Sequence, residues 1–120
     1  MHIKDIEKVL DNNEITYSRN LYIGIYNLIF LDNNYIKNVV VCPTSVNSVI
    51  LIIKFNDPDD YNIYVKNGYS YSNNTDSISK NIYDIDEFLR EIKKLKSYRM
   101  VNIKKAKWLS YMENIFYSIV

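Results

Sequence analysis

The feature that most constrains the fold is an apolar run at residues 46–55, VNSVILIIKF. Valine and isoleucine suit the extended, pleated backbone of a β-strand, in which alternate side chains point to opposite faces. One face of this strand carries Val49, Leu51, Ile53 and Phe55. The other carries Val46, Ile50 and Ile52. Because both faces are apolar in the middle, the run predicts an interior strand of a sheet that is covered on both sides.

Two shorter apolar stretches precede this run. Residues 21–31 and 35–42 are rich in Ile, Leu and Val, and the turn-forming residues 32–34 lie between them. We expect the two stretches to pair as an antiparallel hairpin. Gly24 indicates a bulge or a close backbone approach inside the first stretch. Pro43 lacks the N–H that a strand ladder needs and should end the second.

The Asn67-Gly68 pair gives the strongest local prediction after the central run. Asn and Gly tolerate the positive φ angles of a type I′ turn, so residues 61–66 and 69–72 are expected to form a second hairpin. In that register one face is aliphatic and should meet the core. The other face carries Tyr64, Lys66, Tyr69 and Tyr71, and Asn73 continues it. Three tyrosines are therefore expected on the outer surface.

Three amphipathic helices complete the predicted elements. Apolar residues recur at helical spacing over residues 2–11, and Asp84 with Glu87 resembles the capping box that starts a second helix. Asn102 can cap a third helix, which runs to about Ser118. This third helix has a broad apolar face, formed by Trp108, Leu109, Met112, Ile115, Phe116 and Ile119.

Strands grouped in the middle of the chain, with helices towards its ends, are typical of an α+β fold. A short strand at 15–18 joins those above, whereas the polar residues 72–80 are expected to form a loop. The connections are too short for the helical crossovers that parallel strands need. We therefore predict one α+β domain over residues 1–120, with a largely antiparallel sheet of four to five strands, one N-terminal helix and two C-terminal helices.

Isoleucine, asparagine, lysine and tyrosine dominate the composition, which is typical of a low-GC genome such as that of many phages, viruses and bacteria. Cys42 is the one cysteine, so no intrachain disulfide can form. The charged N-terminus lacks the apolar run of a signal peptide, and no apolar segment reaches the roughly 20 residues that span a bilayer. We expect a cytoplasmic protein, in a bacterium or in a host cell, without membrane contact.

The chain is poor in catalytic and metal-binding residues. Its one histidine, His2, follows the first residue, and Cys42 has no second His or Cys near it in the sequence. The acidic residues at 57–60 lack the spacing of an EF-hand, and two glycines cannot form a Gly-rich phosphate loop. Carboxylates from distant parts of the chain could still meet in space. We nevertheless expect no enzyme activity, no metal and no cofactor.

By elimination, the first hypothesis is a non-catalytic protein-binding module that acts by occupying a partner's surface. Small inhibitors, immunity proteins and phage anti-defence proteins work in this way. Tyrosine offers a large contact area at low entropic cost, and Ser and Asn add adaptable hydrogen bonds. The expected partner-binding residues are Tyr64, Lys66, Tyr69, Tyr71 and Asn73. The sequence leaves the identity of the partner open.

The alternative hypothesis is a small nucleic-acid-binding accessory protein. Residues 90–107 contain eight basic side chains and one acidic side chain, and such a cluster can follow a line of phosphates. The candidate contacts are Arg90, Lys93, Lys94, Lys104, Lys105 and Lys107. The broad apolar face of the last helix also leaves a homodimer through that helix open.

Overall fold

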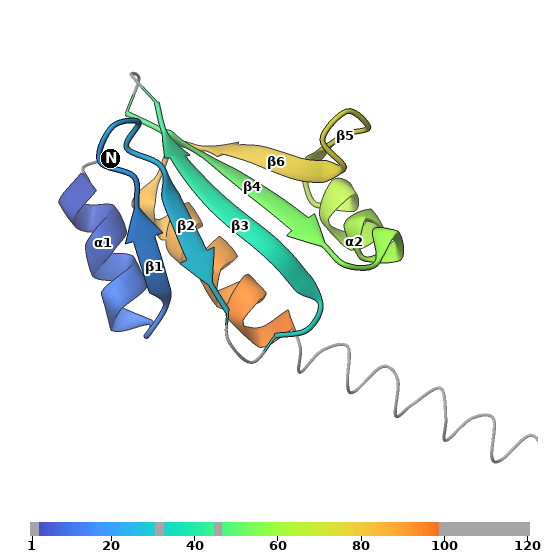
Figure 1. Cartoon of the computed structure of the whole chain (residues 1–120), viewed down its shortest axis with the longest axis horizontal. Coiled ribbons are helices and arrows are strands. Elements are labelled where there is room, and N and C mark those ends of the chain that lie inside the picture. The colour runs from blue at the N-terminus through green and yellow to red at the C-terminus, as the bar shows by residue number, and fades with distance from the viewer. Residues whose placement is uncertain (1–2, 31–32, 45–46, 99–120) are drawn as a thin grey trace, which may run out of the picture.

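The computed structural model describes residues 3–30, 33–44 and 47–98, and Figure 1 shows how their elements are arranged. Along the chain these elements are α1 (Ile3–Asn12), β1 (Thr16–Arg19), β2 (Tyr26–Ile29), β3 (Ile36–Pro43), β4 (Val49–Phe55), the 3-10 turn η1 (Pro58–Asp60), α2 (Tyr61–Lys66), β5 (Ser70–Ser72), β6 (Ser77–Ile82) and a helix over residues 85–98. The six strands form one antiparallel sheet in the order β1-β2-β3-β4-β6-β5. The α+β class and the antiparallel sheet are confirmed, with six strands in place of four to five.

The described part of the chain contains three helices, but they are not distributed as the sequence predicts. The first, α1, precedes the sheet as expected, and the 85–98 helix follows it. The remaining helix, α2, lies between β4 and β5, where a strand was predicted. The second predicted C-terminal helix, at 102–118, lies outside the described residues.

The strand β4 is interior, as predicted, because β3 and β6 are hydrogen-bonded to it on either side. The residues of its covered face, Val49, Leu51, Ile53 and Phe55, are at most 3% exposed. Ile50 and Ile52, on the opposite face, are only half-buried. Among the described residues, helices cover one face of the sheet, and no helix lies over the other. Of the cover predicted on both faces, this part of the chain therefore shows one side only.

Two helices close the covered face, α1 beside β1 and the 85–98 helix behind the middle of the sheet in Figure 1. Phe88, Ile92 and Leu95 recur at helical spacing and are 0% exposed, which confirms the predicted apolar stripe of the 85–98 helix. The Asp84 carboxylate accepts the Asp86 N–H over 3.0 Å just before this helix begins, which confirms Asp84 as the cap, whereas Glu87, the other member of the predicted capping box, forms an ion pair with Lys80.

The predicted hairpin over residues 61–72 is wrong, because residues Tyr61–Lys66 form α2. The Asn-Gly pair ends this helix instead of turning a hairpin. Gly68 has a φ angle of +96°, and the N–H of Tyr69 donates to the carbonyl oxygen of Tyr64 over 3.1 Å. This is the Schellman pattern of a helix end, which favours glycine for the same positive φ that a type I′ turn requires.

The loop predicted at 72–80 is also wrong, because β6 occupies its second half and pairs with both β4 and β5. Ile78 and Ile82 point to the covered face and are 0% exposed. Lys80 lies between them on the same face, where a lysine breaks the apolar alternation that would mark a strand in the sequence. Its side chain reaches the 85–98 helix, where its ammonium lies 3.1 Å from a carboxylate oxygen of Glu87.

The strand predicted at 21–31 is shorter than expected. It begins at Tyr26, as β2, and pairs with β3 through Tyr26–Val41 and Leu28–Val39, so the predicted hairpin of these two stretches is confirmed. The residues between β1 and β2 form a turn that is not part of the sheet.

Candidate functional site

Glu91 is the one charged residue that the described part of the chain buries, with 4% of its surface exposed. It lies on the 85–98 helix. Tyr69 donates its hydroxyl hydrogen to Glu91 Oε2 over 2.8 Å. The ammonium groups of Lys94 and Lys80 lie 3.4 and 3.6 Å from the other carboxylate oxygen. Because a buried carboxylate needs such partners, Glu91 ties the helix to β6 and to the segment that precedes β5.

Two tyrosines lie beside this carboxylate, and both are buried. Tyr64 is 6% exposed and Tyr69 is 3% exposed. Burial raises the pKa of Tyr64. Burial, followed by the hydrogen bond to Glu91, raises the pKa of Tyr69. Both hydroxyls therefore keep their protons at neutral pH, which makes them hydrogen-bond donors rather than general bases.

The predicted outer face of three tyrosines does not exist. Because residues 61–66 are helical, Tyr61 and Tyr64 lie one turn apart on the same side. Both rings pack against Phe55, with centroid separations of 5.5 and 5.3 Å. Of the predicted partner-binding residues, those that remain exposed are Lys66, Tyr71 and Asn73. A role for these three in partner binding stays a prediction, without the continuous surface that motivated it.

A pocket of about 320 Å³ opens between α2 and the 85–98 helix. Its lining residues are Ile63, Tyr64, Asn67, Glu91, Lys94 and Tyr98. The volume is at the lower end of the range for small-ligand sites. However, its carboxylate already has three partners, and the hydroxyl of Tyr64 keeps its proton at neutral pH. Nowhere in residues 3–30, 33–44 and 47–98 do three His, Cys, Asp or Glu side chains gather as metal ligands would.

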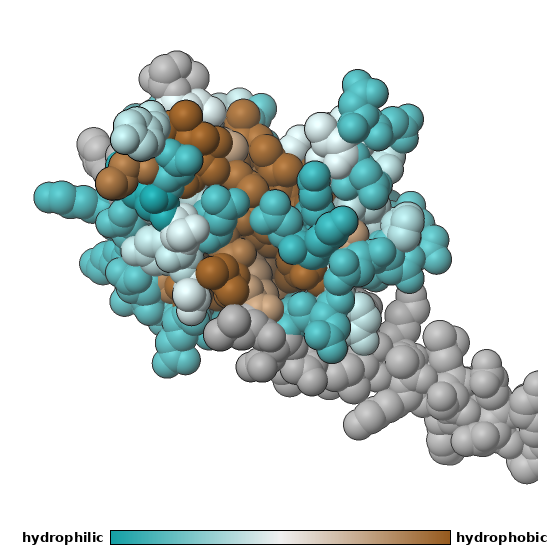
Figure 2. Space-filling model, in the orientation of Figure 1, coloured by the Kyte–Doolittle hydropathy of each residue, from teal (hydrophilic) through white to brown (hydrophobic). Residues whose placement is uncertain are grey.

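The face of the sheet that no described helix covers is a candidate contact surface, and we call it the open face. Its centre is a stripe of four half-buried apolar side chains, Val40 and Cys42 of β3 with Ile50 and Ile52 of β4. Polar residues surround the stripe: Ser18, Asn27, Asn38, Ser79 and Asn81, with Lys54 following Ile52 on the same face of β4. Figure 2 shows this face, with apolar atoms across the middle strands. The solvent face of an antiparallel sheet normally carries polar side chains, so this apolar stripe is a candidate contact surface.

A tight turn between β1 and β2, residues 20–24, projects from one end of the sheet, and we call it the apolar turn. It exposes Leu21 by 83%, Tyr22 by 99% and Ile23 by 64%. The side-chain oxygen of Asn20 accepts the N–H groups of Tyr22 and Ile23 over 3.0 and 3.3 Å. The N–H of Gly24 donates to the main-chain oxygen of Asn20 over 2.7 Å. These hydrogen bonds hold the turn in one shape while its apolar side chains face outward.

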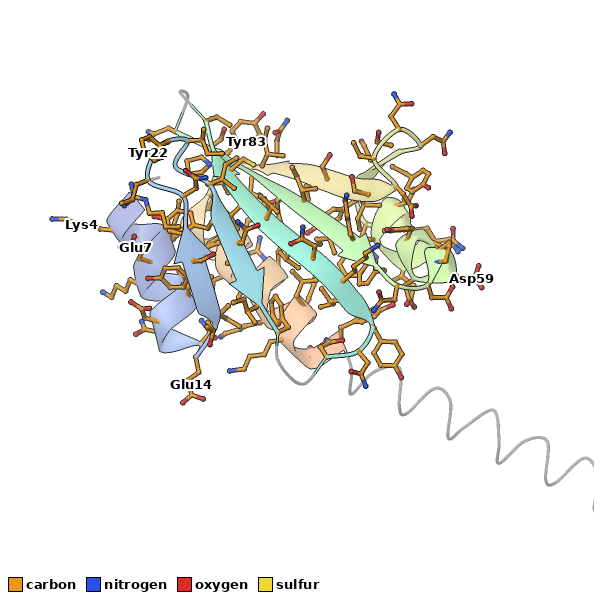
Figure 3. All side chains as sticks on the ribbon, viewed as in Figure 1. Lys4, Glu7, Glu14, Tyr22, Asp59 and Tyr83 are labelled. Carbon is orange, nitrogen blue, oxygen red and sulfur yellow. The ribbon has the colours of Figure 1, made fainter. Side chains whose placement is uncertain are left out.

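Sequence reasoning missed the apolar turn, although one signal for it was present. Gly24 adopts a φ angle of +67°, and an added Cβ there would meet nothing within 4 Å. Glycine is therefore favoured by the turn's backbone conformation and not by a close neighbour. An Asn four residues before such a glycine is turn chemistry. Figure 3 shows Tyr22 at the same end of the sheet as Tyr83, which follows β6 and is 68% exposed.

The predicted basic cluster is only partly described. Arg90, Lys93 and Lys94 are exposed on the 85–98 helix, within about one helical turn of each other. Lys94 also pairs with Glu91, as described above. The other three candidate contacts, Lys104, Lys105 and Lys107, lie outside the described residues. The structure therefore shows that three of the six candidate residues lie close together.

The partners of Glu91 make a stability test possible. Replacing Glu91 with Gln removes the buried negative charge that Tyr69, Lys80 and Lys94 share, while Lys80 keeps its ion pair with Glu87. We expect the free energy of unfolding to fall by about 2 kcal/mol, as when a hydrogen bond to a buried charged group is lost. Urea unfolding followed by circular dichroism measures this. The matched control is Glu87→Gln, whose side chain is 24% exposed and which should change stability by less than about 1 kcal/mol.

The buried tyrosines predict a loss of stability at alkaline pH. Burial, followed by the hydrogen bond to Glu7, raises the pKa of Tyr26 to about 12, whereas an unfolded chain loses that proton near pH 10. Between these values the unfolded state binds fewer protons, so stability falls with pH by up to about 1.4 kcal/mol per unit for this group. We expect Tyr26→Phe to reduce the slope of urea-unfolding free energy between pH 9.5 and roughly 11.5. An equal reduction in the fully exposed Tyr22→Phe control would contradict this assignment.

No protein-family model, no curated protein and no solved structure matches the chain. Among the helices in the described residues, none has the length and apolar character needed to cross a bilayer. Function therefore has to be argued from the two surfaces and the buried site described above.

Proposed function

We propose that this chain is a non-catalytic protein-binding module, which acts by occupying the surface of a partner protein as small inhibitors, immunity proteins and phage anti-defence proteins do. The observation that carries the proposal is the apolar turn. Its three consecutive large side chains, Leu21, Tyr22 and Ile23, are between 64% and 99% exposed. Large apolar side chains in this number are rarely presented to water at one place without a binding role.

The apolar turn is organised before it meets a partner. Its backbone is held by the Asn20 side chain and by the Gly24 hydrogen bond, so binding need not order a flexible loop. An interface formed from a preorganised turn keeps more of its contact energy as affinity. Tyr22, at the tip, combines a large ring with a hydroxyl, which is typical of residues that dominate interface energetics. The matching feature on the partner is an apolar pocket or groove with a polar rim.

The buried site supports the non-catalytic part of the proposal. The carboxylate of Glu91 is engaged by Tyr69, Lys80 and Lys94, and the contacts with Tyr69 and Lys80 join the 85–98 helix to other elements of the fold. An acid–base catalyst has to reach its substrate with a proton acceptor or donor whose pKa is near the working pH. In this pocket the charged groups neutralise one another, and the hydroxyls of Tyr64 and Tyr69 have raised pKa values. This arrangement suits a structural role.

The proposal predicts that affinity for the partner depends on the apolar turn. The full-length protein is used to isolate a partner from cells that carry its gene, and the affinity for that purified partner is measured by titration calorimetry. Replacing Tyr22 with Ser should weaken binding about 30-fold or more, which corresponds to a loss of roughly 2 kcal/mol.

The matched control is the double variant Ile63→Ser/Val65→Ser, because these residues are 43% and 44% exposed on α2, away from the apolar turn. We expect the control to bind as the unchanged chain does. Full affinity in the Tyr22 variant, or a loss confined to the α2 control, would remove the apolar turn as the contact surface.

Nucleic-acid binding remains the second candidate, favoured by the exposure of Arg90 and Lys93 on the outer side of the 85–98 helix. Titration with single- and double-stranded DNA and RNA at two salt concentrations distinguishes the candidates, because binding through phosphates weakens steeply with salt. Salt-dependent binding that is lost in Arg90→Gln/Lys93→Gln would favour this function over the first.

A further inference from the structure

We propose that the pocket between α2 and the 85–98 helix binds a small organic acid that has an aromatic body and one carboxylate group. With a volume of about 320 Å³, the pocket suits a compact molecule. It lies near the end of β4, which α2 follows, whereas the apolar turn lies at the other end of the sheet. The inference therefore does not depend on the proposed function.

The buried part of the pocket's lining is aromatic. The rings of Tyr64 and Tyr98 lie 5.8 Å apart between centroids, with 52° between their planes, and both side chains are buried. Two tilted rings present both faces and edges, so a third ring can pack against them edge-to-face or in an offset stack. Ile63 adds an aliphatic contact at the mouth, where 43% of its surface is exposed. An aromatic body therefore fits this lining.

Lys94 gives the pocket its accessible charge. Its side chain is 58% exposed, and its ammonium lies 3.4 Å from Glu91 Oε1. An ammonium has several hydrogens, so Lys94 can keep this contact and donate another hydrogen to a ligand carboxylate. The negative charge of Glu91 is already shared with Lys80 and with the hydroxyl of Tyr69. A ligand ammonium would have to compete with these partners for Glu91, so the pocket favours an anion.

Asn67 supplies a second polar group, from the other wall of the pocket. Its Nδ2 donates to the carbonyl oxygen of Ile63 over 2.7 Å, which sets the orientation of the amide. A side-chain amide has a second hydrogen, which can donate to an oxygen at the mouth of the pocket. A carboxylate held there would accept hydrogen bonds from Lys94 on one helix and from Asn67 at the end of the other.

Contacts at both ends of α2 connect the two walls of the pocket. The hydroxyl of Tyr98 donates to Asp60 Oδ1 at the start of α2. Tyr69, just beyond the end of α2, donates to Glu91 on the facing helix over 2.8 Å. The ring of Tyr98 also packs on that of Phe55, with 5.0 Å between centroids. Because the walls are joined in this way, a ligand need not order them, and more of its contact energy is kept as affinity.

The test uses two probes of the same shape, phenylacetate and its neutral isostere phenylacetamide. Each is titrated into the full-length, ¹⁵N-labelled protein, and amide chemical shifts are followed by NMR. We expect phenylacetate to saturate the site with a Kd of about 1 mM or lower. It should bind at least about fivefold more tightly than phenylacetamide, because only the acid forms a charge-assisted hydrogen bond with Lys94. The largest shifts should fall in α2 and the 85–98 helix.

A pair of lysine variants tests the role of the charge. Lys94→Gln should reduce the preference for phenylacetate over phenylacetamide to less than about twofold, because the ammonium at the mouth is lost. The matched control is Lys93→Gln, which removes an exposed charge from the same helix outside the pocket lining. We expect this control to keep the full preference.

A second pair of variants tests the apolar contact. Ile63 and Val65 are 43% and 44% exposed on α2, and of the two only Ile63 lines the pocket. Ile63→Ser should weaken both probes alike, by about threefold or more, since each loses the same apolar contact. Val65→Ser should bind both probes as the unchanged chain does. Far-UV circular dichroism confirms that the fold is retained in each variant.

Three results would overturn the proposal. The first is a lack of saturation by phenylacetate up to about 20 mM. The second is a set of amide shifts centred outside α2 and the 85–98 helix, which would place the probe elsewhere on the chain. The third is a preference for the acid that survives in Lys94→Gln or is lost equally in Lys93→Gln.

Discussion

The fold depends on the burial of one face of β4 against the 85–98 helix. Leu51 and Ile53 on the strand and Phe88 and Ile92 on the helix are all 0% exposed, and each such side chain contributes about 1.5–3 kcal/mol when fully buried. This contact brings the helix across β6, which places Glu91 within reach of Lys80. The one buried carboxylate of the described chain is thus a consequence of how the central strand packs, and its contacts with Tyr69 and Lys80 hold the helix at that position.

The sequence predicts the parts of this fold whose pattern is governed by local geometry. The continuous apolar run of β4 and the 3.6-residue spacing of the 85–98 helix are both strong, and both elements are found where expected. The Asn-Gly pair at 67–68 was misread, because a type I′ turn and a helix end both need a residue with positive φ. What decides between them is not local: Tyr61 and Tyr64 pack on Phe55, and the Tyr61 hydroxyl donates to the carbonyl oxygen of Asp76 over 2.7 Å.

The apolar turn and β6 were harder to predict, because the composition of each is typical of a different secondary structure from the one that it adopts. The apolar turn has the composition of a strand, and only the polar contacts of Asn20 and the φ angle of Gly24 separate it from β2. The strand β6 has the composition of a loop, because Lys80 points to the covered side and finds carboxylates on a helix that follows it in sequence. In both cases polar contacts decide the local structure, and the periodicity of apolar residues in the sequence does not reveal such contacts.

The two faces of β4 differ in burial although their composition is similar. Ile50 and Ile52 are as apolar as Leu51 and Ile53, yet only the second pair is fully buried among the described residues. If the open face were a solvent face, polar side chains at 50 and 52 would serve the sheet as well as isoleucine and would not favour aggregation. Isoleucine at these two positions gives the open face an apolar patch between β3 and β4, separate from the apolar turn, which projects past the strand ends. Tyr22 and this patch therefore lie on different parts of the same framework.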